Sequence, residues 1–182
     1  MALKSTVFKA ELQVSDLDRH YYHTHQLTLA RHPSENDARM MVRLVAFALH
    51  ADPALEFTKG LSTQDEPDLW HKELTGDIAL WIDLGQPDEK RLRKAAGRAA
   101  QVVVYSYSGR SAAEWWAQMK DKLDRFDNLA VIDLPEEQVA ALGALVQRSM
   151  RLQCTIQDGE LWLGDTVNTV HLTPCVRKPL RD

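Results

Sequence analysis

The sequence has little of what marks several common protein classes. Two of its 182 residues are cysteines, and Cys154 and Cys175 lack the spacing of a metal site. No apolar run approaches the ~20 residues that a membrane-spanning helix needs. The first residues also lack the apolar core of a signal peptide. We therefore expect a soluble, cytoplasmic protein with reduced thiols and no membrane association.

Two catalytic signatures and an excess of basic charge are also missing. The chain contains neither the Gly-x-Ser-x-Gly of many hydrolases nor the Gly-Lys-Ser/Thr of P-loop proteins. Its 22 Lys and Arg residues stand against 26 Asp and Glu residues, for a formal net charge of -4. A protein that binds nucleic acid over its whole surface is usually basic. Any nucleic-acid site must therefore be local.

Apolar residues are abundant enough for one hydrophobic core. They make up 45% of the chain, and 182 residues is an ordinary domain length. We expect a single domain over residues 1–182. Alternating polar and apolar residues over 5–14 and 21–29, with turn residues between them, predict an N-terminal β-hairpin.

The middle of the chain predicts helices alternating with strands. Ser34 is the expected N-cap of a helix that ends near His50, with Asp37 in the capping-box position. Apolar runs over 78–84 and 101–107 flank the predicted helix 88–99, an order typical of a right-handed βαβ crossover with parallel strands. Ser111 is the expected N-cap of the next helix.

The C-terminal third predicts further strands. An apolar strand over 129–134 precedes a short helix, and Asp158-Gly159 is a hairpin signal between two strands. The last residues, 176–182, are polar, and we expect them to be frayed. The fold class expected is therefore α/β: a mixed β-sheet flanked by helices, extended or covered by the N-terminal β-hairpin and extra C-terminal strands.

Two acids lie close to the strand predicted over 78–84. Asp83 interrupts its far end, and Asp68 precedes it beside a proline. If the two carboxylates met across adjacent strands, they would repel each other and favour a bound cation. Mg²⁺, which prefers oxygen ligands, fits that description. The alternative is a solvated acidic turn around Asp68.

The order Pro67-Asp68, spacer, Asp83-Leu84-Gly85 resembles the PD-(D/E)XK signature of the restriction-endonuclease-like superfamily. The signature's lysine, two residues after the second acid, is Gly85 here. Four segments, MALKSTVFKAEL, LTLARHPSENDARMMVRLVAFAL, ALWIDLGQPDEKRLRKA and LQCTIQDGELWL, resemble the YaeQ family of small bacterial proteins of poorly defined function. This resemblance runs almost end to end, and it implies a restriction-endonuclease-like core over approximately residues 33–134.

The resemblance also implies a Mg²⁺-dependent site for phosphodiester hydrolysis. Asp68 and Asp83 would hold the metal, and Glu35 on the first helix would contribute directly or through water. Gln86 or Lys90 would orient the attacking water in place of the missing lysine. Glu35 has an alternative as a solvated first-turn glutamate. The rival function is a non-catalytic binding or regulatory protein that keeps the fold, with a protein partner.

The helix predicted over 88–99 is the most basic stretch of the chain. It would hold the phosphates of a nucleic acid, or it is an ordinary solvated face. Arg110 lies just past a strand end and is a phosphate contact or a structural ion pair. His23 and His25 share a strand face, but no nearby residue completes a metal site, so solvated edge-strand histidines are favoured. Cys154 is expected to fill the core.

Overall fold

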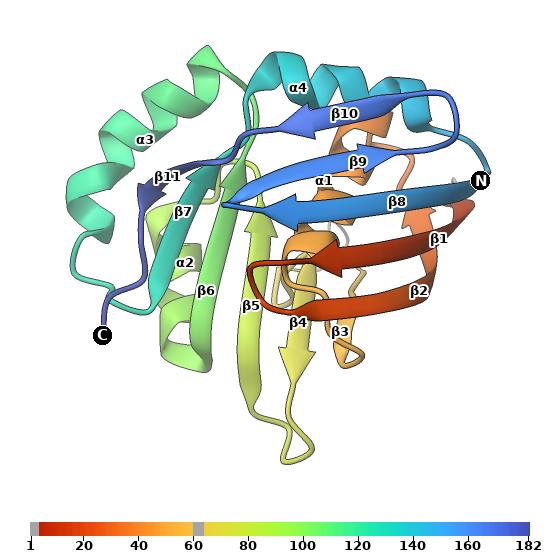
Figure 1. The fold of residues 1–182 in the computed structure, drawn as a ribbon. Coiled ribbons are helices and arrows are strands. Elements are labelled where there is room, and N and C mark those ends of the chain that lie inside the picture. The colour runs from red at the N-terminus through yellow and green to blue at the C-terminus, as the bar shows by residue number, and fades with distance from the viewer. Residues whose placement is uncertain (1–3, 60–63) are drawn as a thin grey trace. The chain divides into compact units, whose positions relative to one another are not determined.

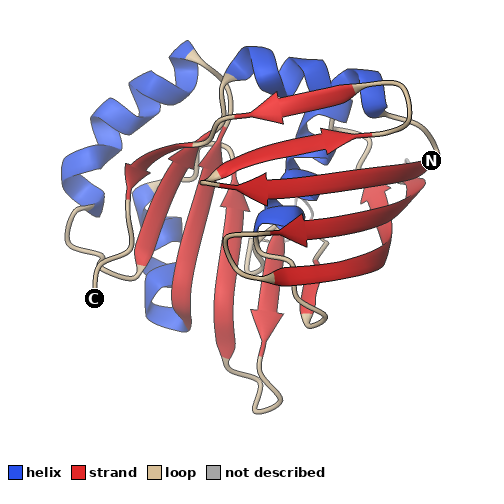
Figure 2. Cartoon of the chain, in the orientation of Figure 1, coloured by secondary structure: helices blue, strands red, loops and turns tan. Residues whose placement is uncertain are grey.

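The computed structural model describes residues 4–59 and 64–182, coloured along the chain in Figure 1. These residues form two compact units. Unit 1 comprises Met1–Pro53 and Glu137–Thr173, and unit 2 comprises Ala54–Glu136 and Pro174–Asp182. In the described residues, one mixed sheet has five strands and the other has six; Figure 2 shows these strands in red. No helix in the described ranges is long and apolar enough to span a membrane.

The sheet of unit 1 is built around the first strand. β1 (Thr6–Asp16) pairs antiparallel with β2 (Tyr21–Arg31), which confirms the N-terminal hairpin, and parallel with β8 (Ser149–Gln157). Apolar side chains of β1 alternate into the core, because successive residues of a strand point to opposite faces. The sheet continues through β9 (Glu160–Gly164) and β10 (Thr169–Leu172).

One helix covers the core of this unit. In α1 (Asp37–Leu49), every residue from 40 to 48 is buried, against β1, β2 and the 3-10 turn η2 (Leu142–Leu145) that follows α4 (Glu136–Ala141). The prediction that Ser34 caps this helix is wrong. Asn36 is the N-cap and accepts a hydrogen bond from Arg39 N at 2.8 Å, whereas the Ser34 hydroxyl contacts His32 Nδ1.

The sheet of unit 2 contains the predicted crossover. β5 (Ile78–Leu84) and β6 (Ala99–Ser106) run parallel, joined by α2 (Glu89–Arg98), and β7 (Leu129–Asp133) continues the parallel set. The predicted βαβ order with parallel strands is therefore confirmed. At the other edge, β5 pairs antiparallel with β4 (Leu69–Lys72), and β4 pairs with β3 (Leu55–Phe57).

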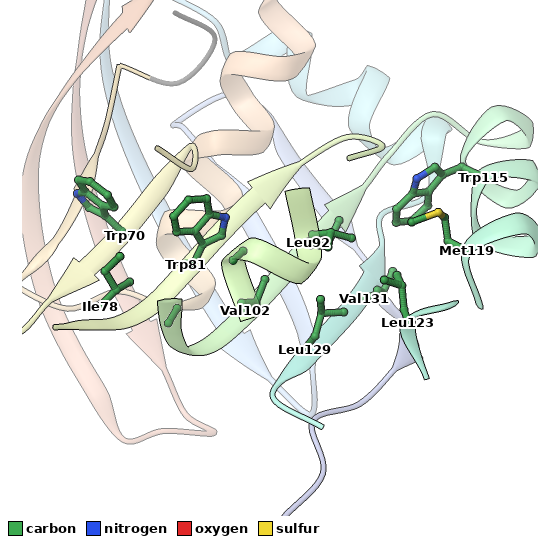
Figure 3. Packing of buried hydrophobic residues seen from close by; sticks show 13 residues of the cluster. Trp70, Ile78, Trp81, Leu92, Val102, Trp115, Met119, Leu123, Leu129 and Val131 are labelled. Carbon is green, nitrogen blue, oxygen red and sulfur yellow. The ribbon is translucent and has the colours of Figure 1, made fainter. Parts of the chain in front are cut away.

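A cluster of buried apolar side chains packs α2 and α3 (Arg110–Leu123) onto one face of the sheet of unit 2. Figure 3 shows its side chains between the sheet, α2 and α3. Leu92 of α2 and Leu123 of α3 are fully buried in it. Burial of a large apolar side chain stabilises a fold by about 1.5–3 kcal/mol. The cluster therefore fixes α2 against β5 and β6, and α2 in turn positions the charged groups described below.

Two further expectations are wrong. Gly109, not Ser111, precedes α3; its φ of 55° lies in the left-handed region, which glycine adopts readily. The C-terminal tail is not frayed throughout, because β11 (Cys175–Lys178) pairs with β7 and the buried Lys178 Nζ donates to two carbonyls of unit 2. Of the two alternatives for the hairpin and the strands β8 to β10, extension of the sheet of unit 2 does not apply. These strands form a sheet of their own.

The α/β class with a mixed sheet and flanking helices is confirmed. A restriction-endonuclease-like core and a single domain over residues 1–182 stay predictions.

Candidate functional site

The two acids predicted to meet are cross-strand neighbours in unit 2. Leu69 of β4 pairs with Ile82 of β5 in an antiparallel register, so Asp68 lies opposite Asp83. Asp68 N also donates to Ile82 O at 3.0 Å, which continues the ladder to this position. Asp68 and Asp83 are 6% and 2% exposed, respectively. We call these two buried residues the acid pair.

Asp83 is held by an arginine that the sequence analysis did not assign to it. Arg91 Nε donates to Asp83 Oδ2 at 2.8 Å, and Arg91 Nη2 donates to Asp83 Oδ1 at 3.0 Å. This is the bidentate geometry in which guanidinium and carboxylate interact most strongly. The same guanidinium donates to the carbonyl oxygens of Gln64 and Glu66, both at 2.8 Å. Arg91 therefore joins Asp83 to the segment before β4.

The ion pair does not determine the ionisation of Asp83 by itself. Burial raises the pKa of the Asp83 carboxyl, and the neighbouring Asp68 carboxylate raises it further. Arg91 lowers this pKa by hydrogen bonding and by its charge, but burial has the largest effect. With both acids ionised, the acid pair and Arg91 carry one excess negative charge.

Asp68 has a structural contact of its own. Its Oδ2 accepts a hydrogen bond from Leu84 N at 2.9 Å. A carboxylate bound to a backbone N–H near a strand end satisfies a donor that would otherwise be unpaired. Asp68 therefore helps to fix the end of β5 whatever else it does.

The third predicted acid, Glu35, lies in unit 1 and is enclosed by arginines. Arg43 donates to both of its oxygens, from Nη2 to Oε1 at 2.6 Å and from Nε to Oε2 at 3.0 Å. Arg39 Nη1 donates to Oε2 at 2.8 Å. The Glu35 side chain is 2% exposed, so it is not the solvated glutamate considered above. Within either unit, the described residues include no group of three or more His, Cys, Asp or Glu that is placed to hold a metal.

The residues proposed to replace the missing lysine lie near the acid pair in sequence but have different surroundings. Gln86 Nε2 donates to Ser111 Oγ at 2.8 Å. Lys90 is exposed on the first turn of α2. Gly85, at the lysine position of the signature, has φ +95°, and a Cβ added to it would meet no atom within 4 Å. A lysine there would have space but an unfavourable backbone conformation.

A cavity of about 370 Å³ lies along α2 in unit 2. We call it the α2 cavity. Trp81 of β5, two residues before Asp83, contributes to its wall, and most of the remaining lining residues are charged. The lining residues are Gln64, Asp65, Trp81, Asp88, Lys90, Arg91, Lys94 and Arg98.

Sequence reasoning missed the roles of Trp81 and Arg91. Side chains alternate between the two faces of a strand, so the sequence alone indicates that Trp81 and Asp83 share a face of β5. Arg91 was one of several cations on a basic helix. Its pairing with Asp83 depends on where α2 begins. Asp88 caps this helix, and its Oδ1 accepts a hydrogen bond from Arg91 N at 2.8 Å.

The remaining candidates lie elsewhere. The rings of His23 and His25 are 4.6 Å apart, and Tyr21 Oη lies 2.9 Å from His25 Nε2. Burial, followed by the neighbouring His23, lowers the pKa of His25. Arg110 pairs with Glu114 at 3.2 Å on the exposed side of α3. Cys154 is buried as expected, which raises its pKa to about 12 and makes it a poor nucleophile.

Comparisons with known proteins agree with one another. A family model described as YaeQ protein matches residues 1–174. The uncharacterized protein YaeQ of Escherichia coli (strain K12) is 48% identical over 172 residues, which cover 94% of this chain and 95% of that protein. The protein of the same name from Salmonella typhi is 47% identical over the same shares of the two chains.

Two crystal structures carry the same family name. The YaeQ protein from Xanthomonas axonopodis pv. citri is 55% identical, with a TM-score of 0.93 over 96% of this chain and 98% of its own. The YaeQ protein from Pseudomonas syringae is 31% identical, with a TM-score of 0.92 over 98% of each chain. The similarity therefore extends over both units.

The enclosure of Glu35 predicts a structural role that calorimetric or chemical unfolding can test. Glu35→Gln removes the buried carboxylate charge that Arg43 contacts through both of its oxygens, and we expect the free energy of unfolding to fall by about 3–5 kcal/mol. The control, Glu137→Gln, changes an exposed acid of the same unit and should cost less than about 0.5 kcal/mol. Combined Glu35→Leu and Arg43→Met should recover most of the loss. Wild-type stability in Glu35→Gln would contradict this role.

The raised pKa of Asp83 predicts how stability changes with pH. The pKa of Asp83 is higher in the folded protein than its ordinary value of 3.8, which applies to the unfolded chain. The folded protein therefore binds this proton more tightly. The stabilisation that comes from this proton is therefore complete at pH values below 3.8, and it is lost as the pH rises through the pKa of the folded protein. Relative to Asp83→Asn, the wild type should lose stability with rising pH, by at most about 1.4 kcal/mol per pH unit.

Urea unfolding at a series of pH values measures this difference. Asp121→Asn, at an exposed position on α3, serves as the control and should track the wild type. Wild-type stability that rose with pH relative to Asp83→Asn would mean that the ion pair with Arg91 outweighs burial. The pKa of Asp83 would then be lowered, and the prediction would be wrong.

Proposed function

This chain belongs to the YaeQ family, and from that premise we propose that it binds the phosphodiester backbone of a nucleic acid through α2 of unit 2, as a binding or regulatory protein rather than a nuclease. The curated relatives are named as uncharacterized, so their names supply no activity. The proposal depends on the contacts of unit 2.

The charge of α2 supports backbone binding. Five of its ten residues are Lys or Arg, whereas the whole chain is acidic. Lys90, Arg93 and Lys94 are exposed, and within residues 4–59 and 64–182 they have no ion-pair or hydrogen-bond partner. Unpaired cations on one helix attract phosphates and release counterions on binding.

The observation that carries the non-catalytic assignment is the pairing of Asp83 with Arg91. Both oxygens of Asp83 accept hydrogen bonds from the guanidinium, and Asp68 Oδ2 accepts from Leu84 N. A divalent cation would have to displace Arg91 and would then lie beside its positive charge. As arranged, the acid pair does not fit Mg²⁺. The position of the signature lysine is also a glycine with a positive φ.

Fluorescence anisotropy with single-stranded, double-stranded and structured oligonucleotides tests the binding function. We expect binding that weakens as salt is raised. Replacing Lys90, Arg93 and Lys94 together by Gln should reduce the slope of log K against log salt by about 2 to 3, because each phosphate contact contributes about 0.7 to 0.9.

The matched control replaces Lys120 and Lys122 of α3 by Gln, which removes exposed charge outside α2. That variant should keep the wild-type slope. If the slope fell equally in the two variants, the effect would come from the net charge of the protein, which would contradict a site on α2.

Mg²⁺-dependent phosphodiester hydrolysis is a second candidate, favoured by one observation. Two buried carboxylates lie opposite each other, Asp68 just before β4 and Asp83 on β5, and burial and Asp68 both raise the pKa of Asp83. Paired carboxylates of this kind occur at catalytic sites more often than elsewhere, although structural pairs also shift pKa values.

Cleavage assays and calorimetry separate the two candidates. With Mg²⁺ or Mn²⁺, we expect no cleavage of any of the oligonucleotides, and no difference in Mg²⁺ affinity between the wild type and Asp83→Ala. Cleavage that disappears in Asp68→Ala, or Mg²⁺ affinity that disappears in Asp83→Ala, would establish the hydrolytic site and overturn the non-catalytic assignment.

A further inference from the structure

Three of the four sheet edges formed by the described strands are protected. β3, β10 and β11 each end a sheet, and they have three, four and four residues. β11 also has a register shift and carries two cations, Arg177 and Lys178. Short length, irregular pairing and charge are the usual features that keep a sheet edge from pairing with another chain. The fourth edge is β2, in unit 1.

β2 is long and regular and has almost no charged side chains. It contains eleven residues, and all eleven pair with β1 without a register shift. The stretch 21–30 includes no Lys, Arg, Asp, Glu or Pro. The last residue, Arg31, is paired with Asp37. An edge of this kind readily accepts an additional strand.

The direction of the backbone groups of β2 follows from the pairing of β1. Lys9 N donates to Arg148 O at 2.8 Å, so the odd-numbered residues of β1 direct their N–H and C=O groups at β8. The even-numbered residues of β1 therefore bond to β2, where their partners are the odd-numbered residues from Tyr21 to Leu29. Because these groups alternate between the two sides of a strand, the even-numbered residues of β2 direct theirs outward.

The outward groups are available within the described part of the chain. They belong to exposed residues: Tyr22, Thr24, Gln26, Thr28 and Ala30. At one end, Arg43 Nη2 donates to Ala30 O at 3.1 Å. The backbone groups of the other four residues have no partner in residues 4–59 and 64–182. Each of these four residues therefore offers one donor and one acceptor to a neighbouring strand.

A second copy of β2 complements this edge. Antiparallel pairing about a twofold axis at Gln26 places Gln26 opposite the partner's Gln26 and Thr24 opposite the partner's Thr28. Both strands then direct free groups at each other, and each of these pairs exchanges two hydrogen bonds. No like charges meet in this register. On the other face of the sheet, the half-buried Leu27 would lie against the partner's His25, which covers part of its apolar surface.

We infer that the edge of β2 is an interface between two copies of this chain, in which β2 pairs antiparallel with its own copy and joins two five-stranded sheets. A strand of another protein would have to match this length without charged residues, whereas the chain itself supplies such a strand. Twofold dimers are also the commonest assemblies of identical chains. The interface lies in unit 1 and does not depend on nucleic-acid binding by α2.

Sedimentation of a concentration series tests the interface with two matched variants. Gln26→Lys places two like charges at the twofold axis and should raise the dissociation constant of the dimer at least about tenfold. The introduced lysine can still contact Glu11, to which Gln26 Nε2 donates at 3.0 Å, so we expect the variant to fold. Gln153→Lys adds the same charge at an exposed position of the interior strand β8 and should change the constant by less than about twofold.

A wild-type protein that stays monomeric at millimolar concentration would overturn the inference. Equal effects of Gln26→Lys and Gln153→Lys would do the same, because net charge rather than the edge of β2 would then govern association.

Amide hydrogen exchange locates the interface in the wild type. The even-numbered amides of Thr24, Gln26 and Thr28 should be protected in the dimer and should lose protection on dilution. The odd-numbered amides of His23 and His25 bond to β1 and should stay protected in both states. A dimer in which the even-numbered amides exchange rapidly would use another surface, and the inference would be wrong.

Disulfide formation tests the register in a Cys175→Ser background, which removes the exposed thiol. Gln26→Cys places two thiols opposite each other, at a Cα separation of ~5.5 Å that lies within the disulfide range of ~4.4–6.8 Å. Tyr22→Cys is the control, because its two copies would lie eight residues apart along the strands, or ~27 Å. We expect oxidation to give a covalent dimer of the first variant only. No covalent dimer of Gln26→Cys, or equal yields of the two, would contradict the twofold axis at Gln26.

Discussion

The bidentate pair between Asp83 and Arg91 is the interaction on which unit 2 depends. Asp83 stands near the end of a central strand, and Arg91 lies in the first turn of the helix that follows it. By also donating to the carbonyls of Gln64 and Glu66, the guanidinium fixes the segment before β4 to the same point. One arginine thus joins a strand end, a helix start and a loop. Without it, the buried Asp83 carboxylate would lose the cation that donates to both of its oxygens.

The pairing also changes the meaning of the acid pair. Two aspartates on adjacent strands resemble a metal site when the sequence is considered alone. In the folded protein, the ligand positions on Asp83 belong to a guanidinium, and the cations left over on α2 face outward. The acid pair is therefore internal to unit 2, and the exposed cations of α2 are the groups on which the proposed function depends.

The strands and helices of unit 2 were predictable because their signals are local. The apolar runs of β5 and β6, with Asp88 before the helix between them, give the crossover, and strand spacing gives the adjacency of Asp68 and Asp83. The Asp83–Arg91 pair was not predictable in the same way. It depends on the exact start of α2 and on packing of the helix against the sheet, which bring one of several basic residues onto the carboxylate.

The errors at the helix ends have a similar cause. Ser34 and Asn36 are both good N-caps within three residues, and the choice between them is made by the path of the preceding chain, in which His32 takes the Ser34 hydroxyl. The polar C-terminal segment looked unstructured because its partner, β7, is far away in sequence. The pairing of β1 with β8 is equally remote, so nothing near either strand indicates it.

The discontinuous make-up of unit 1 has a consequence for biosynthesis. The ribosome releases β1 and β2 early, but β1 cannot acquire its parallel neighbour until residues 149–157 have emerged. All of the strands β3 to β7 are translated in the meantime. The nascent hairpin must therefore keep one β1 edge open throughout, and an open edge with alternating apolar residues is a target for chaperones and for aggregation.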